Sequence, residues 1–245
     1  MYRLIIALTV LLSQQAHAER LFADSHTHFN WDQKEIISAQ EVIAILDKHD
    51  VDLTIVAGTP SELALELREA GDERIVPFFS PYIHELGKRD WYLKQEVVER
   101  AKEGLEKGLY YGIGEVHFMN GFLPKTDNRI FLQLIELAKK HDVPMMIHID
   151  SSNELTFQQL CEANPGVKLI FAHAGGDLRA KHIVTILDAC PNVWIDFAAR
   201  DPWRYDGLTK DDYTLLDDWK ALVIRYPDRF ITGTDPVWKV TRWST

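Results

Sequence analysis

The residues of this sequence that could do chemistry are four histidines and two acids, each near the end of an apolar segment. His26 and His28 stand two positions apart and directly follow the segment 21–25. Alternate residues of an extended segment face the same side, so both imidazoles can reach one ion. The other four occur at the ends of later segments: Glu115, His148, His173 and Asp235.

Such a set predicts a metal centre. Imidazoles and carboxylates form a borderline-hard group of nitrogen and oxygen ligands, suited to zinc, manganese, iron or nickel and poorly suited to calcium. A single buried histidine is more often a hydrogen-bonded core residue. Four histidines and two acids at one edge are not explained as core residues, because burying two uncompensated carboxylates would be costly. We expect one or two divalent ions, most readily zinc.

Short β-branched or aromatic segments alternate with longer amphipathic segments from residue 20 to the end of the chain. This alternation predicts βα units and a parallel sheet. The expected strands are 21–25, 52–57, 75–80, 111–116, 144–149, 168–172, 193–197 and 230–233. The expected helices are 41–49, 62–70, 91–107, 129–141, 155–163, 178–189 and 212–226.

Eight parallel strands with seven intervening helices predict an α/β fold of the (β/α)8, or TIM-barrel, type over residues 19–245. About 250 residues are typical of that fold. A doubly wound open sheet is the alternative. Only residues 235–245 remain after the last strand, so the eighth helix is expected to be missing or truncated. Active sites of such barrels lie at the carboxyl ends of the strands, where the six residues fall.

Residues 1–18 read as a cleavable signal peptide. Arg3 is followed by the apolar run 4–12, and Ala16 and Ala18 are small residues at the two positions that a signal peptidase reads. The apolar run is too short to cross a bilayer, which takes about 20 residues. We therefore expect cleavage after Ala18 and a secreted or periplasmic protein with no membrane span.

The amino-acid composition limits which binding partners the protein can have. Acidic residues outnumber basic ones by 37 to 27 in 245 residues, and no block of Lys and Arg occurs, which disfavours nucleic acid as a partner. The chain has two cysteines, Cys161 and Cys190, too few for a disulfide scaffold. Their positions favour ordinary buried cysteines, although export leaves a disulfide open. A homo-oligomer also stays open.

The order of the candidate ligands resembles that of the amidohydrolase superfamily of metal-dependent hydrolases. Three local sequences carry the likeness to its amidohydrolase-related branch: Asp24-Ser25-His26-Thr27-His28, Phe171-Ala172-His173-Ala174-Gly175-Gly176 and Gly233-Thr234-Asp235. The resemblance spans the whole chain after the predicted signal peptide.

The resemblance implies roles for these residues. In such enzymes His26, His28 and Asp235 would hold the first ion, joined by His148 where only one ion is present. With two ions, His148 and His173 would hold the second and Glu115 could bridge both. With one ion, His173 is instead free to polarise substrate or move a proton. Glu115 could also orient a ligand histidine.

The expected reaction is hydrolysis of an amide, ester or lactone bond in a small organic substrate. A bound divalent ion lowers the pKa of its water to about 7, and Asp235 can take a proton and pass it to the leaving group. The alternatives are a one-metal decarboxylase of the same superfamily and a non-catalytic periplasmic binding protein. A nuclease would need a positively charged groove, which the sequence does not indicate.

Residues on the loops after the strands are expected to bind substrate. We predict this role for His84, His117 and Arg200. Three basic residues could hold a substrate carboxylate by charge-assisted hydrogen bonds: Arg200, Arg204 and Lys239.

Overall fold

The computed structural model describes residues 22–118, 124–149, 154–201, 204–211 and 214–237. The predicted signal peptide and Lys239 lie outside these residues. The strands are β1 (Phe22–Asn30), β2 (Val51–Thr59), β3 (Ile75–Phe78), β4 (Ile113–Phe118), β5 (Met145–Ile149), β6 (Leu169–Phe171), β7 (Val193–Asp196) and β8 (Phe230–Ile231). The α-helices are α1 (Trp31–Lys34), α2 (Ala39–Lys48), α3 (Glu62–Gly71), α4 (Gln95–Glu106), α5 (Arg129–His141), α6 (Glu154–Ala163), α7 (Ala180–Ala189) and α8 (Asp217–Arg225).

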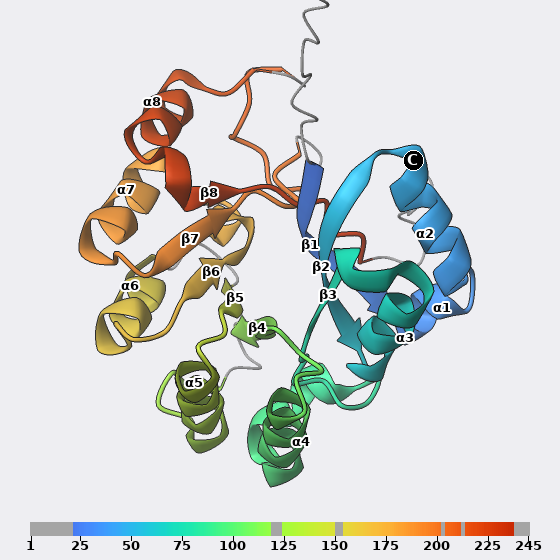
Figure 1. The fold of residues 1–245 in the computed structure, drawn as a ribbon. Helices are drawn as coiled ribbons and strands as arrows, with labels where there is room; N and C mark the ends of the chain where they lie inside the picture. The colour runs from blue at the N-terminus through green and yellow to red at the C-terminus, as the bar shows by residue number, and fades with distance from the viewer. Residues whose placement is uncertain (1–21, 119–123, 150–153, 202–203, 212–213, 238–245) are drawn as a thin grey trace, which may run out of the picture.

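The strands surround a common axis and the longer helices lie outside them (Figure 1). Hydrogen bonds define two sheets, β1-β2-β3 and β4-β5-β6-β7-β8, and every strand pair in them is parallel. The sheets meet at both edges. Phe79 forms a parallel bridge with Ile113, and the Ser25 amide donates to the Thr232 carbonyl over 2.8 Å. The α/β architecture of the (β/α)8 type is thus confirmed, whereas the predicted truncation of an eighth helix concerns residues beyond Val237.

The junction between β1 and the segment after β8 depends on a glycine. A β-carbon added at Gly233 would lie 2.6 Å from the His26 β-carbon and 2.7 Å from the His26 backbone nitrogen. Only a residue without a side chain lets the two segments approach this closely. The Asp235 amide also donates to the His26 carbonyl over 2.8 Å, so this junction, the β1–β8 seam, continues up to the candidate site.

Local sequence explains where the helices lie. Helix α5 has the predicted bounds, because the Asn128 side chain accepts hydrogen bonds from the Ile130 and Phe131 amides and one face of the helix is buried. Helix α2 begins two residues before the predicted start, since Ser38 and Glu41 form a reciprocal cap there.

Other boundaries differ more. The helix expected over 91–107 is interrupted at Lys94, whose extended backbone separates a short 3-10 helix at Trp91–Leu93 from α4. Helix α8 begins at Asp217 rather than at 212. Strand β1 extends to Asn30, five residues past the predicted end, and therefore includes both histidines.

The core has layers inside and outside the ring of strands. Apolar side chains of the helices pack against the outer faces of the strands in two large clusters, one over β1–β3 and one over the other sheet. A small third cluster joins residues of β3, β5 and β6 with Ala172: Phe78, Met146, Ile170 and Ala172. The polar candidate site lies at or just after the carboxyl ends of β1, β4, β5, β6 and β8.

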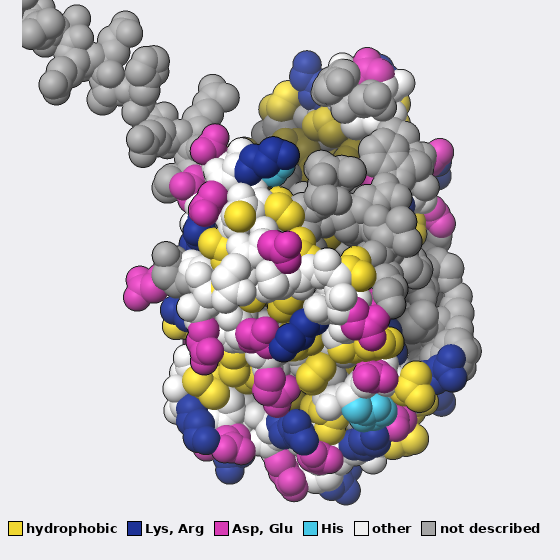
Figure 2. Space-filling view, turned by 90° about the vertical axis from the view of Figure 1, so that its right-hand side faces the viewer, with side chains coloured by type: hydrophobic (Ala, Val, Ile, Leu, Met, Phe, Trp, Pro, Cys, Tyr) yellow, Lys and Arg dark blue, Asp and Glu magenta, His cyan; other side chains and the backbone are white. Residues whose placement is uncertain are grey.

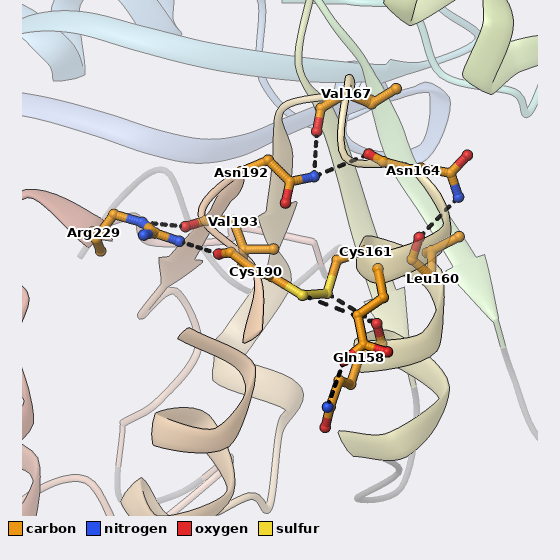
Figure 3. The surroundings of a disulfide bond; sticks show 10 residues. Gln158, Leu160, Cys161, Asn164, Val167, Cys190, Asn192, Val193 and Arg229 are labelled. Carbon is orange, nitrogen blue, oxygen red and sulfur yellow. Dashed lines mark hydrogen bonds between the residues drawn. A yellow bond between two sulfur atoms is a disulfide. The ribbon is translucent and has the colours of Figure 1, made fainter. Parts of the chain in front are cut away.

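Cys161 and Cys190 form a disulfide, with α-carbons 6.0 Å apart, so the interpretation as ordinary unpaired cysteines is wrong. The bond joins α6 to the residue that ends α7 (Figure 3). Asn192 donates to the carbonyls of Asn164 and Val167, and Arg229 donates to the carbonyl of Cys190 over 2.6 Å. The disulfide is part of a network that holds the turns before β6 and β7 together.

One face of the molecule is mixed in charge. Figure 2 shows the face formed by the right-hand side of Figure 1, where Lys and Arg side chains are interspersed with Asp and Glu. In the part of the chain that the structure describes, no helix is both long and apolar enough to cross a bilayer.

Candidate metal centre and active site

Strand β1 holds the two histidines of the His-x-His pair side by side. Their Nε2 atoms are 3.1 Å apart. His26 Nδ1 lies 2.6 Å from a carboxylate oxygen of Asp196, and His28 Nδ1 donates to the Ala57 carbonyl over 3.0 Å. Because each Nδ1 is held by an acceptor, each ring presents Nε2 to the interior of the barrel.

The second sheet and the segments after it supply the other four predicted ligands. Glu115 lies on β4 and His148 on β5. His173 belongs to the 3-10 helix Ala172–Gly175 directly after β6, and Asp235 follows β8. His173 and Asp235 both have left-handed backbone conformations, with φ of 57° and 52°. Such residues are uncommon outside glycine and concentrate at functional sites.

The six side chains converge. Glu115 Oε1 lies 2.9 Å from His148 Nδ1 and 3.1 Å from His173 Nε2. The other oxygen, Oε2, lies 3.4 Å from His28 Nε2. Asp235 Oδ1 lies 3.3 Å from His28 Nε2 and 3.8 Å from His26 Nε2. All six predicted residues therefore meet at the carboxyl end of the barrel, and their role as ligands remains a prediction.

Three possible ligand atoms face one another in this cluster. When its ring is neutral and its Nδ1 donates, each of His26 and His28 has a lone pair on Nε2. Asp235 Oδ1 is buried and accepts no hydrogen bond within the described part of the chain. These three atoms all lie within 4.8 Å of one another. Converging nitrogen and oxygen acceptors fit a divalent cation with three protein ligands and an open position.

The charges of the cluster agree with a cation site. Glu115, Asp196 and Asp235 all approach the fully buried His26, at 3.7, 2.6 and 3.8 Å. Burial by itself lowers the pKa of His26, but these three carboxylates raise it well above its usual value. Burial would raise the pKa of Asp235, yet the histidines hold it below its usual range. Asp235 thus stays ionised, and the cluster stabilises positive charge beside it, which a proton on His26 or a bound cation can supply.

Arg204 orients Asp235. Its Nη2 donates to Asp235 Oδ2 over 2.7 Å, and its Nη1 donates to the Asp235 carbonyl over 3.0 Å. The two contacts leave Oδ1 directed at the histidines. Arg204, which the sequence indicated as a carboxylate-binding residue for substrate, is already paired with a carboxylate of the protein.

Sequence reasoning missed two acids of the site. Asp196 is the last residue of β7, a position that matches the rule that found Glu115 and His148, but the strand was expected to continue to 197. Asp24 accepts hydrogen bonds from the Thr234 amide and hydroxyl, at 3.0 and 2.6 Å, and from the His26 amide. Burial raises the pKa of Asp24. Asp24 therefore fastens the segment before Asp235 to β1.

A cavity of about 260 Å³ opens above the cluster. That volume is slightly below the usual range for ligand sites, so it fits a small substrate. Among the residues that line it are five of the six predicted ligands: His28, Glu115, His148, His173 and Asp235. Residues outside these six line it too, among them Tyr82, Lys88, Arg204 and Tyr205.

The three predicted substrate-binding residues have different surroundings. His117 lines the cavity, with its Nε2 3.3 Å from Glu115. His84 is not among the lining residues and lies 3.0 Å from Asp90, on the loop after β3. Arg200 is buried over the ring of Trp219, away from the lining, and burial lowers its pKa to about 10. The geometry brings only His117 to the cavity.

The fold and cluster define a class: (β/α)8 proteins with histidines and carboxylates gathered at the carboxyl ends of the strands. A family model described as amidohydrolase matches residues 94–245, and the chain belongs to this family. The family is part of the amidohydrolase superfamily, whose members bind divalent metals. No curated protein sequence matches the chain.

Solved structures share the fold at low sequence identity. An amidohydrolase from Burkholderia multivorans with bound HEPES is 17% identical, with a TM-score of 0.59 over 88% of this chain and 84% of that chain. A probable 2-pyrone-4,6-dicarboxylic acid hydrolase from Acinetobacter baumannii with bound citric acid is 14% identical, with a TM-score of 0.60 over 91% and 88%. A 2,6-dihydroxybenzoate decarboxylase in complex with 2,6-dihydroxybenzoate is 10% identical, with a TM-score of 0.53 over 87% of this chain and 88% of that chain. The fold is thus common to hydrolases and decarboxylases.

Proposed function

We propose that the protein is a secreted or periplasmic metal-dependent hydrolase that cleaves an amide, ester or lactone bond of a small organic substrate. The observation that carries the proposal is the meeting of three possible ligand atoms, His26 Nε2, His28 Nε2 and Asp235 Oδ1, in a buried cluster beneath a cavity. Asp235 Oδ1 has no hydrogen-bond partner within the described residues. A divalent ion bound there, zinc by preference, would supply an activated water and polarise a carbonyl oxygen. Glu115, His148 and His173 are the candidates for a second ion.

The side chains around that position divide the remaining work. Asp235 stays ionised beside three histidines, so its carboxylate can accept a proton from the attacking water and return it to the leaving group. Arg204 keeps the carboxylate in one orientation. His173 donates through Nδ1 to the Ala198 carbonyl over 2.9 Å, which leaves its Nε2 able to bind an ion or accept a proton.

Metal content per chain tests this proposal. The protein would be purified without chelators or a metal-binding tag and compared with Glu115→Gln, Asp235→Asn and the surface control Glu106→Gln. Two ions falling toward one in Glu115→Gln, with turnover of a lactone, ester or amide that Asp235→Asn loses, would support a two-metal hydrolase. No bound ion after addition of zinc or manganese would contradict it.

One observation favours a second candidate, a one-metal decarboxylase. Glu115 Oε1 lies within hydrogen-bond distance of two imidazoles, those of His148 and His173, so Glu115 can orient these histidines directly instead of holding an ion. One ion that is unaffected by Glu115→Gln, together with release of carbon dioxide from a carboxylic acid and no hydrolysis, would favour this reaction.

Export is the other part of the proposal. Residues 1–18 have the order of regions of a signal peptide, and the Cys161–Cys190 disulfide is of a kind that persists in oxidising compartments. When the full chain is expressed in a bacterium, we expect the periplasmic fraction to contain a protein that begins at Glu19 by mass spectrometry. An uncleaved chain confined to the cytosol would contradict the prediction.

A further inference from the structure

Among the described residues that line the cavity, two have cationic side chains, Lys88 and Arg204, and the partners of these two differ. Arg204 is paired with Asp235 through its side chain and backbone. Lys88, in the short 3-10 helix Gly87–Arg89 after β3, has its Nζ 3.1 Å from His117 Nε2 and 5.6 Å from the centre of the Tyr82 ring. Within the described residues, Lys88 forms no ion pair with a carboxylate. Its charge is therefore available to a ligand of the cavity.

The neighbours of Lys88 fix the direction of its amine. The His117 amide donates to the Tyr82 hydroxyl oxygen over 2.8 Å, and His117 Nδ1 lies 2.5 Å from the same oxygen. The His117 ring also stacks on His148, with centroids 4.4 Å apart. This buried, fixed ring accepts one hydrogen bond from Lys88, and an ammonium group has three donors. The remaining donors can serve a ligand in the cavity.

We propose that Lys88 binds a carboxylate of the substrate, so that the protein acts on small carboxylic acids. The inference rests on the proposed function, because it takes the reacting carbonyl to lie at the cluster of His28, Glu115 and Asp235. The Lys88 amine and Glu115 Oε2 both lie close to one atom, His117 Nε2, at 3.1 and 3.3 Å. The carboxylate and the reacting carbonyl of such a substrate are therefore separated by only a few bonds.

The sequence proposed Arg200, Arg204 and Lys239 for carboxylate binding; Lys239 lies outside the described residues, and Lys88 takes the role proposed for the two arginines. The Arg200 guanidinium donates to the Leu178 carbonyl over 3.1 Å and lies 5.3 Å from the centre of the Trp219 ring, away from the cavity lining. Arg204 already neutralises Asp235. Among the described residues that line the cavity, Lys88 is thus the cation that has no carboxylate partner, and a carboxylate that enters the cavity can pair with its amine.

Binding of simple acids to the metal-loaded protein tests the inference without requiring turnover. Calorimetry would compare malonate, succinate and benzoate with the neutral diamide succinamide. We expect Lys88→Met to weaken carboxylate binding about tenfold or more, as removal of a charge-assisted hydrogen bond does, and Lys88→Arg to retain most of it. Succinamide binding should be the same in the unmodified protein and in Lys88→Met.

The matched control is Lys168→Met. Lys168 directly precedes β6, at the opposite end of the barrel, and pairs with Asp142 over 2.8 Å, so this variant changes the net charge equally without touching the cavity. Equal carboxylate affinity in the unmodified protein and Lys88→Met, an equal loss in Lys168→Met, or no binding of any of the three acids would each overturn the inference. Thermal unfolding of each variant shows that its fold is retained.

The same samples separate the two proposals. Elemental analysis of the unmodified protein reports whether an ion is bound. A bound ion with carboxylate affinity that ignores Lys88 would reject only the role of Lys88. Absence of any ion would reject the hydrolase, while carboxylate binding that depends on Lys88 in the metal-free protein would still support the subsite.

Discussion

At the scale of single residues, the three inward-facing imidazoles of His26, His28 and His173 differ in what holds them. Backbone carbonyls accept from His28 and His173, whereas His26 is held by the fully buried carboxylate of Asp196. An anionic partner on one nitrogen makes the opposite nitrogen a better donor to a metal. Asp196 is therefore a positioning residue that also tunes its neighbour electrostatically.

Asp196→Asn tests this role. The amide keeps the size of the side chain but removes its charge, so we expect metal affinity to fall by about 10-fold to 100-fold. A titration with zinc, followed by competition with a chelator, measures the change. Asp188→Asn, on the exposed surface of α7, is the control and should keep the affinity of the unmodified protein. Unchanged affinity in Asp196→Asn would show that the carboxylate has no influence on the ion.

Much of the site could be predicted because ligands at the ends of parallel strands must meet at one edge. This rule identified Glu115, His148 and His173 from sequence position alone. It could not identify partners such as Asp196, which is 170 residues away from His26 in the chain. Nor could it show that Arg204 is paired with Asp235 or that Arg200 packs over Trp219, because those contacts depend on the path of the segment after β7.

At the scale of elements, helix predictions were best where an end is capped by a side chain. Asn128 determines the start of α5, and its amphipathic pattern continues to the predicted last residue. The predicted first strand ends too early, at Ser25, because the polar residues after Ser25 resemble a loop. They remain extended since the His26 and His28 side chains face the site and the Thr27 hydroxyl bonds to residues of β2.

The close packing at the β1–β8 seam leads to a prediction about stability. In Gly233→Ala the new methyl group would collide with the His26 backbone, so we expect a loss of about 1–3 kcal/mol in the free energy of unfolding. Metal affinity should fall as well, because Asp235 would move away from β1.

Gly166→Ala is the matched control for Gly233→Ala. The nearest atom to its added carbon is the flexible end of Lys139, at 3.3 Å, so stability should change little. Urea denaturation of both variants measures the difference. If Gly233→Ala and Gly166→Ala are equally stable, the close approach of the two segments at the seam does not contribute to stability.

At the scale of the whole molecule, the disulfide stabilises the half of the barrel that contains β6 and β7. It closes a loop between cysteines 29 residues apart. In the chain-entropy model such a loop contributes about 3–4 kcal/mol to the free energy of unfolding. We expect Cys161→Ala/Cys190→Ala to lose about that amount in urea denaturation while it still binds metal. A thiol assay that finds two reactive cysteines in the unreduced, unfolded protein would contradict the bond.

The β1–β8 seam also divides the ligands of the proposed metal centre. His26 and His28 belong to the first sheet, and Asp235 belongs to the segment after the last strand of the second. An ion bound by all three residues would link the two sides of the β1–β8 seam and oppose transient opening of the seam. Amide hydrogen exchange in β1 should then become slower when metal is added, whereas exchange in α5, on the far side of the barrel, should stay the same.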